Sequence, residues 1–309
     1  MDKLRTFKID STVIHGVQSL QVRAELPIEP LPPFGGAPKR GGSLAEDILV
    51  IPALTTATVT ATVLLDEQTF LTSLLNSPAS TNVLNKVFAN SGLLGAEITV
   101  VGTNHTMILA DTRLTSLSVG WDQGSGLMVA QVAYMGITPQ LTYVSESYGV
   151  SDTTISPISK YHASSFSLHS AGKLGLTISE LKTIETLDFS LGLQFITKPR
   201  YMSKIPYVFI KYPIVMEGSM SLIAPERGSV TYDLEDIGYS RQSLKGDVTI
   251  SLTGAESTAI TLGLKRAALE MAQIDDASPS PRSRYELTFR GYCYSSGTSG
   301  EYFYVSVIP

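Results

Sequence analysis

The feature that most constrains the fold is an alternating strand pattern that occurs twice at a fixed distance. Residues 20–26 (LQVRAEL) alternate apolar with polar side chains, and residues 187–193 (LDFSLGL) do the same. The offset is 167, since 187 − 20 and 193 − 26 both give that number. A period of two residues is typical of a half-buried strand. The sequence therefore predicts the same β unit twice.

Each of these strands leads into a segment interrupted by prolines. The first is Pro27–Gly42 and the second is Thr197–Pro213. Proline removes a backbone donor, so neither segment is expected to form a central strand or a helix. A second alternating strand follows each one, at 57–65 and at 216–222. Each half therefore has a strand, a long arm and a second strand.

A helix is predicted next in each half. In the first half the helical region covers 66–92: Asp66 can cap a first turn, and a helix then restarts at Ser77-Pro78 and ends at Ser91-Gly92. In the second half the counterpart is shorter, 232–237, and ends at Gly238. Both halves then finish with further strands, at an expected offset near 152 that rises to 155 between the closing glycines, Gly136 and Gly291.

One segment gives conflicting signals. Residues 264–273 (LKRAALEMAQ) have the composition of a helix. Their repeat partner, residues 113–121 (RLTSLSVGW), alternates like a strand. Propensity is a weak guide beside the repeat, so we predict a strand at 264–273.

The fold class that follows is mainly β with a few short helices (α+β). We predict two tandem antiparallel β-sandwich or barrel domains, 1–150 and 151–309, each with one helix and a long protruding arm. The join is expected in the Ser/Thr/Gly-rich run from Tyr148 to Ser165.

The charge content excludes some classes of protein. Charged residues are 17% of the chain, hydrophobic residues are 43%, and the net charge is −5. A disordered chain and a generally cationic nucleic-acid binder do not have this composition. The low charge suggests that other subunits cover much of the surface. The first 150 residues carry 12 acids and 8 bases, and the rest carry 16 and 15, so the first half is the more acidic one.

No catalytic, cofactor-binding or metal-binding residue is predicted, and we do not expect an enzyme. His15, His105, His162 and His169 have no metal-ligand spacing, and His162 and His169 lie seven residues apart in a Ser-rich segment. Cys293, the one cysteine, excludes an internal disulfide and is expected to be a packed thiol in the closing strand. Trp121 is expected to anchor the core or an interface.

The second arm has the only unusual charge pattern. Basic residues alternate with aromatic ones between Lys198 and Tyr212, and no acid lies between Asp188 and Glu217. Such a pattern is typical of single-stranded nucleic-acid binding. We favour instead an arm that docks on an acidic protein surface, because tyrosine and arginine are also enriched at protein interfaces. No secretory signal or transmembrane helix is recognised, so the host cytoplasm is the expected compartment of synthesis.

The order of strand, long arm, strand, helix and a final run of strands closed at a glycine resembles the tail tube proteins of long-tailed bacteriophages, here in a duplicated form. The resemblance covers nearly the whole chain and rests on architecture. It implies a structural virion protein that forms stacked rings around a DNA-conducting channel in the phage tail. Rings of this family contain six barrel-like units, so three duplicated chains would give a pseudo-sixfold ring.

The resemblance also implies partners. These are other copies of the chain, other tail proteins (a sheath if the tail is contractile, the baseplate and the terminator) and DNA that passes without specific contacts. No cofactor and no membrane span are expected. The arms resemble the contacts between rings. The contact residues expected there are Pro32, Phe34, Lys39, Arg40, Lys198, Arg200, Tyr201, Lys204, Tyr207 and Phe209.

Two alternatives remain open from the sequence. One is a baseplate hub or tube-initiating ring protein of the same fold. The other is a soluble two-domain β-sandwich protein that binds a ligand. For the channel lining, the face of Thr56–Thr62 and the acids Asp188 and Glu217 are candidates.

Overall fold

The structure is a computed structural model, and it describes sixteen separate stretches of the chain. These are residues 6–25, 28–31, 49–52, 56–65, 96–102, 106–136, 142–144, 160–170, 177–178, 184–198, 207–224, 230–231, 245–254, 259–275, 283–293 and 303–308. The described residues are mainly β-strand, and the strands pair antiparallel. Both predicted helices, 66–92 and 232–237, lie outside the described residues.

The strands divide into two groups along the chain. The first ten strands are β1 (Thr6–Ile9), β2 (Thr12–Ile14), β3 (Val17–Glu25), β4 (Ile28–Leu31), β5 (Leu49–Pro52), β6 (Thr56–Leu64), β7 (Ala96–Val101), β8 (Thr106–Asp122), β9 (Met128–Gly136) and β10 (Thr142–Val144). The later strands are β11 (Tyr161–Ser170), β12 (Thr177–Ile178), β13 (Ile184–Lys198), β14 (Tyr207–Ala224), β15 (Val230–Thr231), β16 (Lys245–Gly254), β17 (Ala259–Asp275), β18 (Ser283–Cys293) and β19 (Phe303–Ile308).

Alternation of apolar and polar residues explains why these segments are strands. In β6, Ala57, Val59 and Ala61 are buried, whereas Thr58 and Thr60 are exposed. In β13, the four apolar residues predicted to face the core are all buried: Leu187, Phe189, Leu191 and Leu193. One face of each strand thus covers the core and the other carries polar groups.

The pairing order of the strands occurs twice. In the first half the neighbours are β3-β6-β9-β8-β7-β1, and in the second half they are β13-β14-β18-β17-β16-β11. The short strand β10 pairs with the start of β8 as β19 pairs with the start of β17. Every step of the first series therefore has a counterpart in the second.

The irregularities in the ladders repeat as well. The β3–β6 ladder has a bulge at Gln18, and the β13–β14 ladder has one at Glu185, an offset of 167 (185 − 18). The β8–β9 ladder has a bulge at Thr115, and the β17–β18 ladder has one at Glu270, an offset of 155 (270 − 115). Bulges are specific local features, so their recurrence shows that the register itself is repeated.

The same comparison corrects part of the predicted alignment. The offset of about 152 after the helix is wrong. A third ladder irregularity lies at Glu97 in β7 and at Asp247 in β16, an offset of 150 (247 − 97). The next strands, β8 and β17, are related by 155 residues, as the closing glycines also are. The single predicted offset therefore stands in place of two, 150 between β7 and β16 and 155 between β8 and β17.

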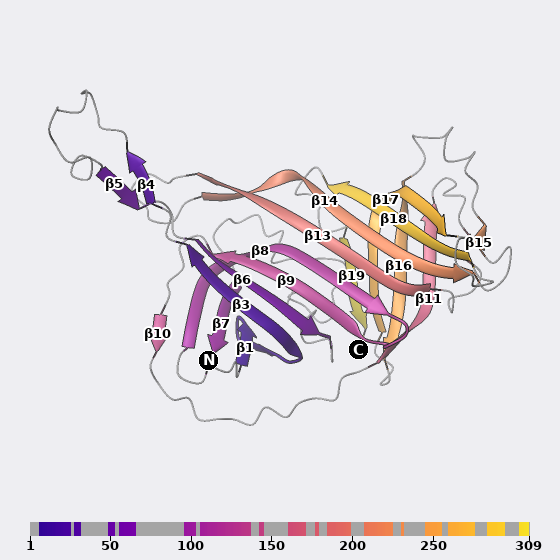
Figure 1. Ribbon diagram of the computed structural model, residues 1–309, viewed down its shortest axis with the longest axis horizontal. Helices are drawn as coiled ribbons and strands as arrows, with labels where there is room; N and C mark the ends of the chain where they lie inside the picture. The colour runs from indigo at the N-terminus through magenta and orange to yellow at the C-terminus, as the bar shows by residue number, and fades with distance from the viewer. Residues whose placement is uncertain are drawn as a thin grey trace.

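The two halves share one sheet. The C-terminal part of β8 pairs with β13, from Asp122 opposite Thr186 to Ser116 opposite Gly192. Figure 1 shows β13 lying along β8, so the long strands form one broad curved layer. The buried residues of both halves also form one cluster, which includes Trp121. Trp121 is thus a core residue, one of the two roles expected for it.

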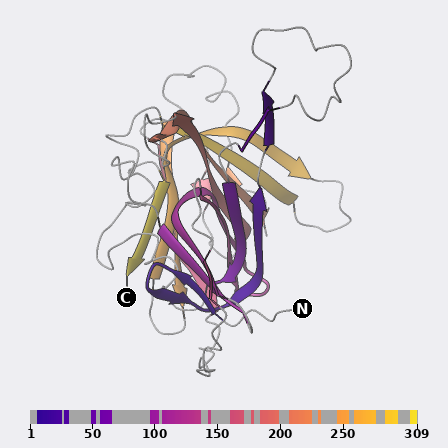
Figure 2. The same cartoon turned by 90° about the vertical axis from the view of Figure 1, so that its left-hand side faces the viewer.

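The arms begin as paired strands. In the first half, β4 pairs with β5, and this hairpin stands apart from the main sheet in both views (Figures 1 and 2). In the second half, β13 and β14 continue side by side to the pair Lys198 and Tyr207. Pro213 does not interrupt β14, contrary to the expected break, because the β13–β14 ladder shifts register beside it, between Gly192 and Gln194.

Of two further predictions from the sequence, one is confirmed and the other is partly wrong. Residues 264–273 lie in β17, so the predicted strand is confirmed against the local helix propensity. The expected join from Tyr148 to Ser165 is wrong at its end, because β11 begins at Tyr161 and pairs with β16. His162 and His169 therefore belong to a strand. Residues 145–159 lie outside the described part.

Candidate functional site

A continuous polar face lies on the side of the sheet that is opposite the core. Ladder partners connect it across seven strands, β3, β6, β9, β8, β13, β14 and β18. One row of directly opposed residues crosses all of them. This polar row is Ser19, Thr62, Gln131, Ser118, Ser190, Glu217 and Arg290. Seven strands from two halves of the chain thus contribute one polar residue each to a single line.

Neutral hydrogen-bonding groups dominate this face. Beside the polar row, Thr60 and Gln21 pair across β3 and β6. The hydroxyls of Thr186 and Ser221 lie 2.6 Å apart on β13 and β14. A shallow hollow on the face is lined by residues that include Ser118, Gln131 and Ser190. Such side chains exchange hydrogen bonds readily with water and form no strong attachment to a charged polymer.

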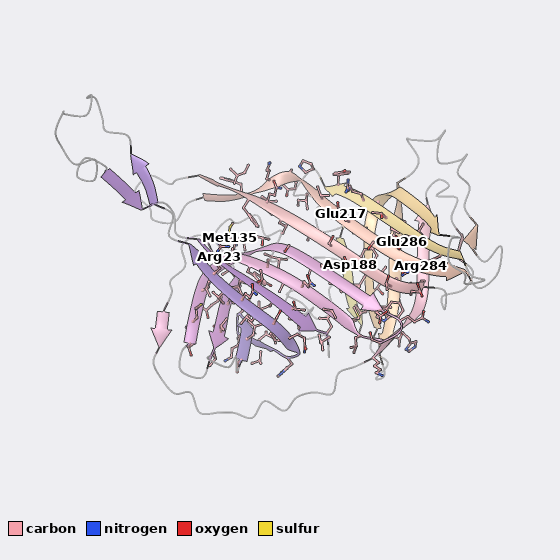
Figure 3. The ribbon with its side chains drawn as sticks, viewed as in Figure 1. Arg23, Met135, Asp188, Glu217, Arg284 and Glu286 are labelled. Carbon is pink, nitrogen blue, oxygen red and sulfur yellow. The ribbon has the colours of Figure 1, made fainter. Side chains whose placement is uncertain are left out.

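Two arginines of the face are paired with glutamates. Arg290 donates to Glu217 through Nη2 and Oε1 at 2.6 Å. Arg284 lies 3.4 Å from Glu185, between Nε and Oε2. Figure 3 shows Asp188, Glu217, Glu286 and Arg284 on the long strands of the second half, with Arg23 and Met135 toward the other end of the sheet. In the second half, the positive charge of Arg284 and Arg290 on this face is therefore accompanied by negative charge.

Asp188 lies at the seam between the two halves. Its strand β13 pairs with β8, and Ser118 Oγ donates a hydrogen bond of 2.8 Å to Asp188 Oδ2. Gly120, directly opposite, leaves room for the carboxylate, because a Cβ there would lie 3.2 Å from Oδ2. Partial burial raises the pKa of Asp188, and the bond from Ser118 opposes that rise. The seam thus holds a half-buried carboxylate.

The raised pKa predicts a gain in stability for Asp188→Asn. A group whose pKa is raised by folding contributes most stability when protonated, and this contribution is lost as the pH rises through its pKa. The amide removes the buried charge and can still accept from Ser118. We expect the midpoint of thermal unfolding to rise at neutral pH, and the difference to shrink as the pH falls toward the ordinary Asp pKa of about 3.9.

A matched control for this prediction is Asp122→Asn. Hydrogen bonds from Ser125, one of them 2.8 Å from its backbone N to Oδ2, hold the pKa of Asp122 below its usual value. A lowered pKa contributes stability above the unfolded pKa. This variant should therefore be slightly destabilised at neutral pH. Equal responses of the two variants to pH would contradict the assignment.

The structure describes only part of the predicted arm contacts. Lys198 and Tyr207 form the last described pair of the β13–β14 hairpin. Phe209 lies two residues further along β14, opposite Ile196. The other predicted contact residues lie outside the described residues. These are Pro32, Phe34, Lys39, Arg40, Arg200, Tyr201 and Lys204.

The described base of this hairpin exposes apolar surface. Phe209 is 50% exposed and Ile196 is 44% exposed. The two residues are directly opposed across the β13–β14 ladder, so they form one small apolar patch. The hairpin thus has exposed apolar groups in addition to the basic residues noted in the sequence. Ile196 was not singled out from the sequence, although its exposed neighbour Phe209 was.

The described residues offer little for catalysis or metal binding. Within them, no three His, Cys, Asp or Glu side chains are grouped so that they could hold a metal ion. They also contain no helix of the length and apolarity needed to cross a membrane. On the polar face, the Ser118 hydroxyl donates a hydrogen bond directly to the Asp188 carboxylate, and no histidine lies between them. No protein-family model matches the chain, and no curated protein matches it.

Sequence reasoning found some of the polar face and missed its extent. The sequence predicts the face of Thr56–Thr62, Asp188 and Glu217 as candidates, and Thr60, Asp188 and Glu217 do lie on this one surface. Gln131, Ser118 and Arg290 were missed. The alternation of β8, β9 and β18 gives each of them an outward position. The β8–β13 pairing, which joins the two groups, leaves no mark in the sequence.

Proposed function

We propose that this chain is a duplicated tail tube protein, a structural subunit of a bacteriophage tail. The observation that carries the proposal is the strand order that occurs twice with the same bulges. It supports two copies of one β unit, which we assign to 1–150 and 151–309, each with a helix and an arm. The side-by-side joining of two units through β8 and β13 supports further units being added in the same way.

The polar face is the proposed lining of the channel. A duct for DNA must not hold the phosphate backbone, and free cationic groups would do so. Arg290 and Arg284 are each paired with a glutamate, and the polar row is otherwise mostly hydroxyl and amide. Because this face carries little unpaired charge, DNA would slide past it without being held. The negative net charge of the whole chain adds mild repulsion.

Three chains would complete a ring of six β units, and rings would stack into the tube. The product belongs in the virion and is assembled in the host cytoplasm. Its proposed partners are other copies, the neighbouring tail proteins and the DNA that passes through. The arms are the proposed contacts between rings. Support comes from the exposed pair Ile196 and Phe209 and from the basic residues beyond it.

Negative-stain microscopy of the purified protein tests this function. Long tubes of uniform diameter are the expected result. Discrete rings that do not elongate would favour a baseplate hub or a tube-initiating ring of the same fold. A monomer that stays monomeric at high concentration would contradict both and favour a ligand-binding protein.

The stacking contact predicts the effect of reversing charge in the second arm. Replacing Lys198, Arg200 and Lys204 with glutamate should prevent tubes while leaving the fold intact, because an arm that docks on the more acidic first half would then be repelled. Tube length by microscopy and the far-UV circular dichroism spectrum measure the two effects. Tubes of normal length from this variant would contradict the role of the arm.

A further inference from the structure

The junction between the two halves is a specific strand pairing. β13 lies antiparallel to the C-terminal part of β8, with Leu187 opposite Trp121 and Phe189 opposite Val119. All four of these side chains are buried. The core therefore runs through the junction without a break, and the polar face runs through it on the other side. The protein thus contains one complete example of how one unit joins the next.

Among the strands that the structure describes, the two equivalent to this junction each have a partner on one side only. β3 is the counterpart of β13, and it pairs with β6 alone. β17 is the counterpart of β8, and its residues from Met271 to Asp275 pair with β18 alone. Within the described ranges, no strand pairs with the second edge of either segment. The described part of the sheet therefore ends at one side in a β13-like edge and at the other in a β8-like edge.

The side chains of β3 differ from those of β13 as an open edge would require. Leu187 and Phe189 of β13 are 3% and 1% exposed. Their counterparts at an offset of 167, Leu20 and Val22, are only partly buried, although they pack against the same core. A neighbouring strand covers the first pair, and no strand of the described part covers the second. An apolar edge strand left open is a template for pairing with another chain.

We infer that β3 of one copy pairs antiparallel with residues Met271–Asp275 of β17 in the next copy. The register follows from the β8–β13 junction, because offsets of 167 and 155 relate the strands. Phe189 opposite Val119 becomes Val22 opposite Ile274, and Leu191 opposite Leu117 becomes Ala24 opposite Ala272. The occupant of each edge is thus a second copy of this chain. The inference rests on the ring of the proposed function, but not on what passes through it.

The contact joins two different edges, so it is heterologous and must close into a ring or continue as a filament. Closure removes both open edges at once. Because the internal and external junctions would have the same register, each would turn the chain by a similar angle. The polar side of the sheet would then continue from copy to copy around the whole ring.

Paired cysteines test the register. We expect Val22→Cys with Ile274→Cys to cross-link between copies under mild oxidation, since directly opposed residues have Cβ atoms about 4.5–5.5 Å apart. On a non-reducing gel the single-chain band should shift to bands of two and three chains. The matched control is Val22→Cys with Gln273→Cys, in which a one-residue slip places the two side chains on opposite faces.

Each outcome has a defined meaning. The single variants Val22→Cys and Ile274→Cys are oxidised in parallel. They retain Cys293, so the cross-linking that they show measures the reactivity of that cysteine. Equal cross-linking in the slipped pair, or none in the matched pair while the protein still assembles, would overturn the inference. A protein that stays monomeric would overturn the inference and the ring together. Cross-linked three-chain rings that never stack into tubes would support the junction and contradict the tail tube.

Discussion

Replacing Gly218 with alanine is expected to destabilise the protein by about 3 kcal/mol, near the upper end of what overpacking a core costs. Gly218 lies directly opposite Phe189, and a Cβ at this position would lie 2.7 Å from Cε1 and 2.8 Å from Cδ1 of that ring. Leu264 Cδ1 would be 3.2 Å away. Phe189 is 1% exposed, so its ring is enclosed by the core and cannot turn out into solvent. Urea unfolding measures the loss.

A second substitution separates crowding from other effects of the alanine. Phe189→Leu shortens the side chain that the new methyl group would meet. In combination with Gly218→Ala, we expect the double variant to be more stable than the sum of the single effects by at least about 1 kcal/mol. Gly192→Ala is the matched control, because a Cβ there meets nothing within 4 Å. Additive effects in the double variant would contradict the packing argument.

Alternation was enough to predict most of the strands. The segments 57–65 and 187–193 each place an apolar residue at every second position, and the burial follows this pattern. The segment 264–273 was predicted correctly only because its repeat partner alternates. Its own composition favours a helix, and β17 forms as a strand because it lies between β16 and β18. Tertiary pairing overrides a weak local preference.

The offsets between the halves could not be read accurately for a physical reason. A bulge adds a residue to one strand without changing the pattern on either side. The ladder irregularities at Glu97 and Asp247 interrupt the alternation that an alignment by eye follows. The pairing of β8 with β13 was equally hidden, because strands so far apart in the sequence carry no mark of which edge they share. The polar face depends on that pairing, so only parts of it were predicted.

Replacing Gly16 with alanine is expected to cost about 3 kcal/mol or more and to abolish assembly. Gly16 connects β2 to β3 with a φ of +73°, a left-handed conformation that costs an L-residue about 1–2 kcal/mol. The larger problem is space, since a Cβ would lie 2.3 Å from the backbone oxygen of Leu64. The backbone N–H of Leu64 donates to the oxygen of Gly16 at 2.8 Å, so the two segments are already in contact.

The chain can relieve this contact only by moving the start of β3 away from β6. β3 is the strand that we propose to pair with the next copy, so its displacement would remove the register on which a closed ring depends. Urea unfolding gives the loss of stability, and sedimentation velocity gives the loss of rings. Gly124→Ala in the β8–β9 turn is the control, because a Cβ there would meet Asp122 at ordinary distances of 3.5 and 3.7 Å. If Gly16→Ala assembled as well as this control, β3 would not be the edge that joins the copies.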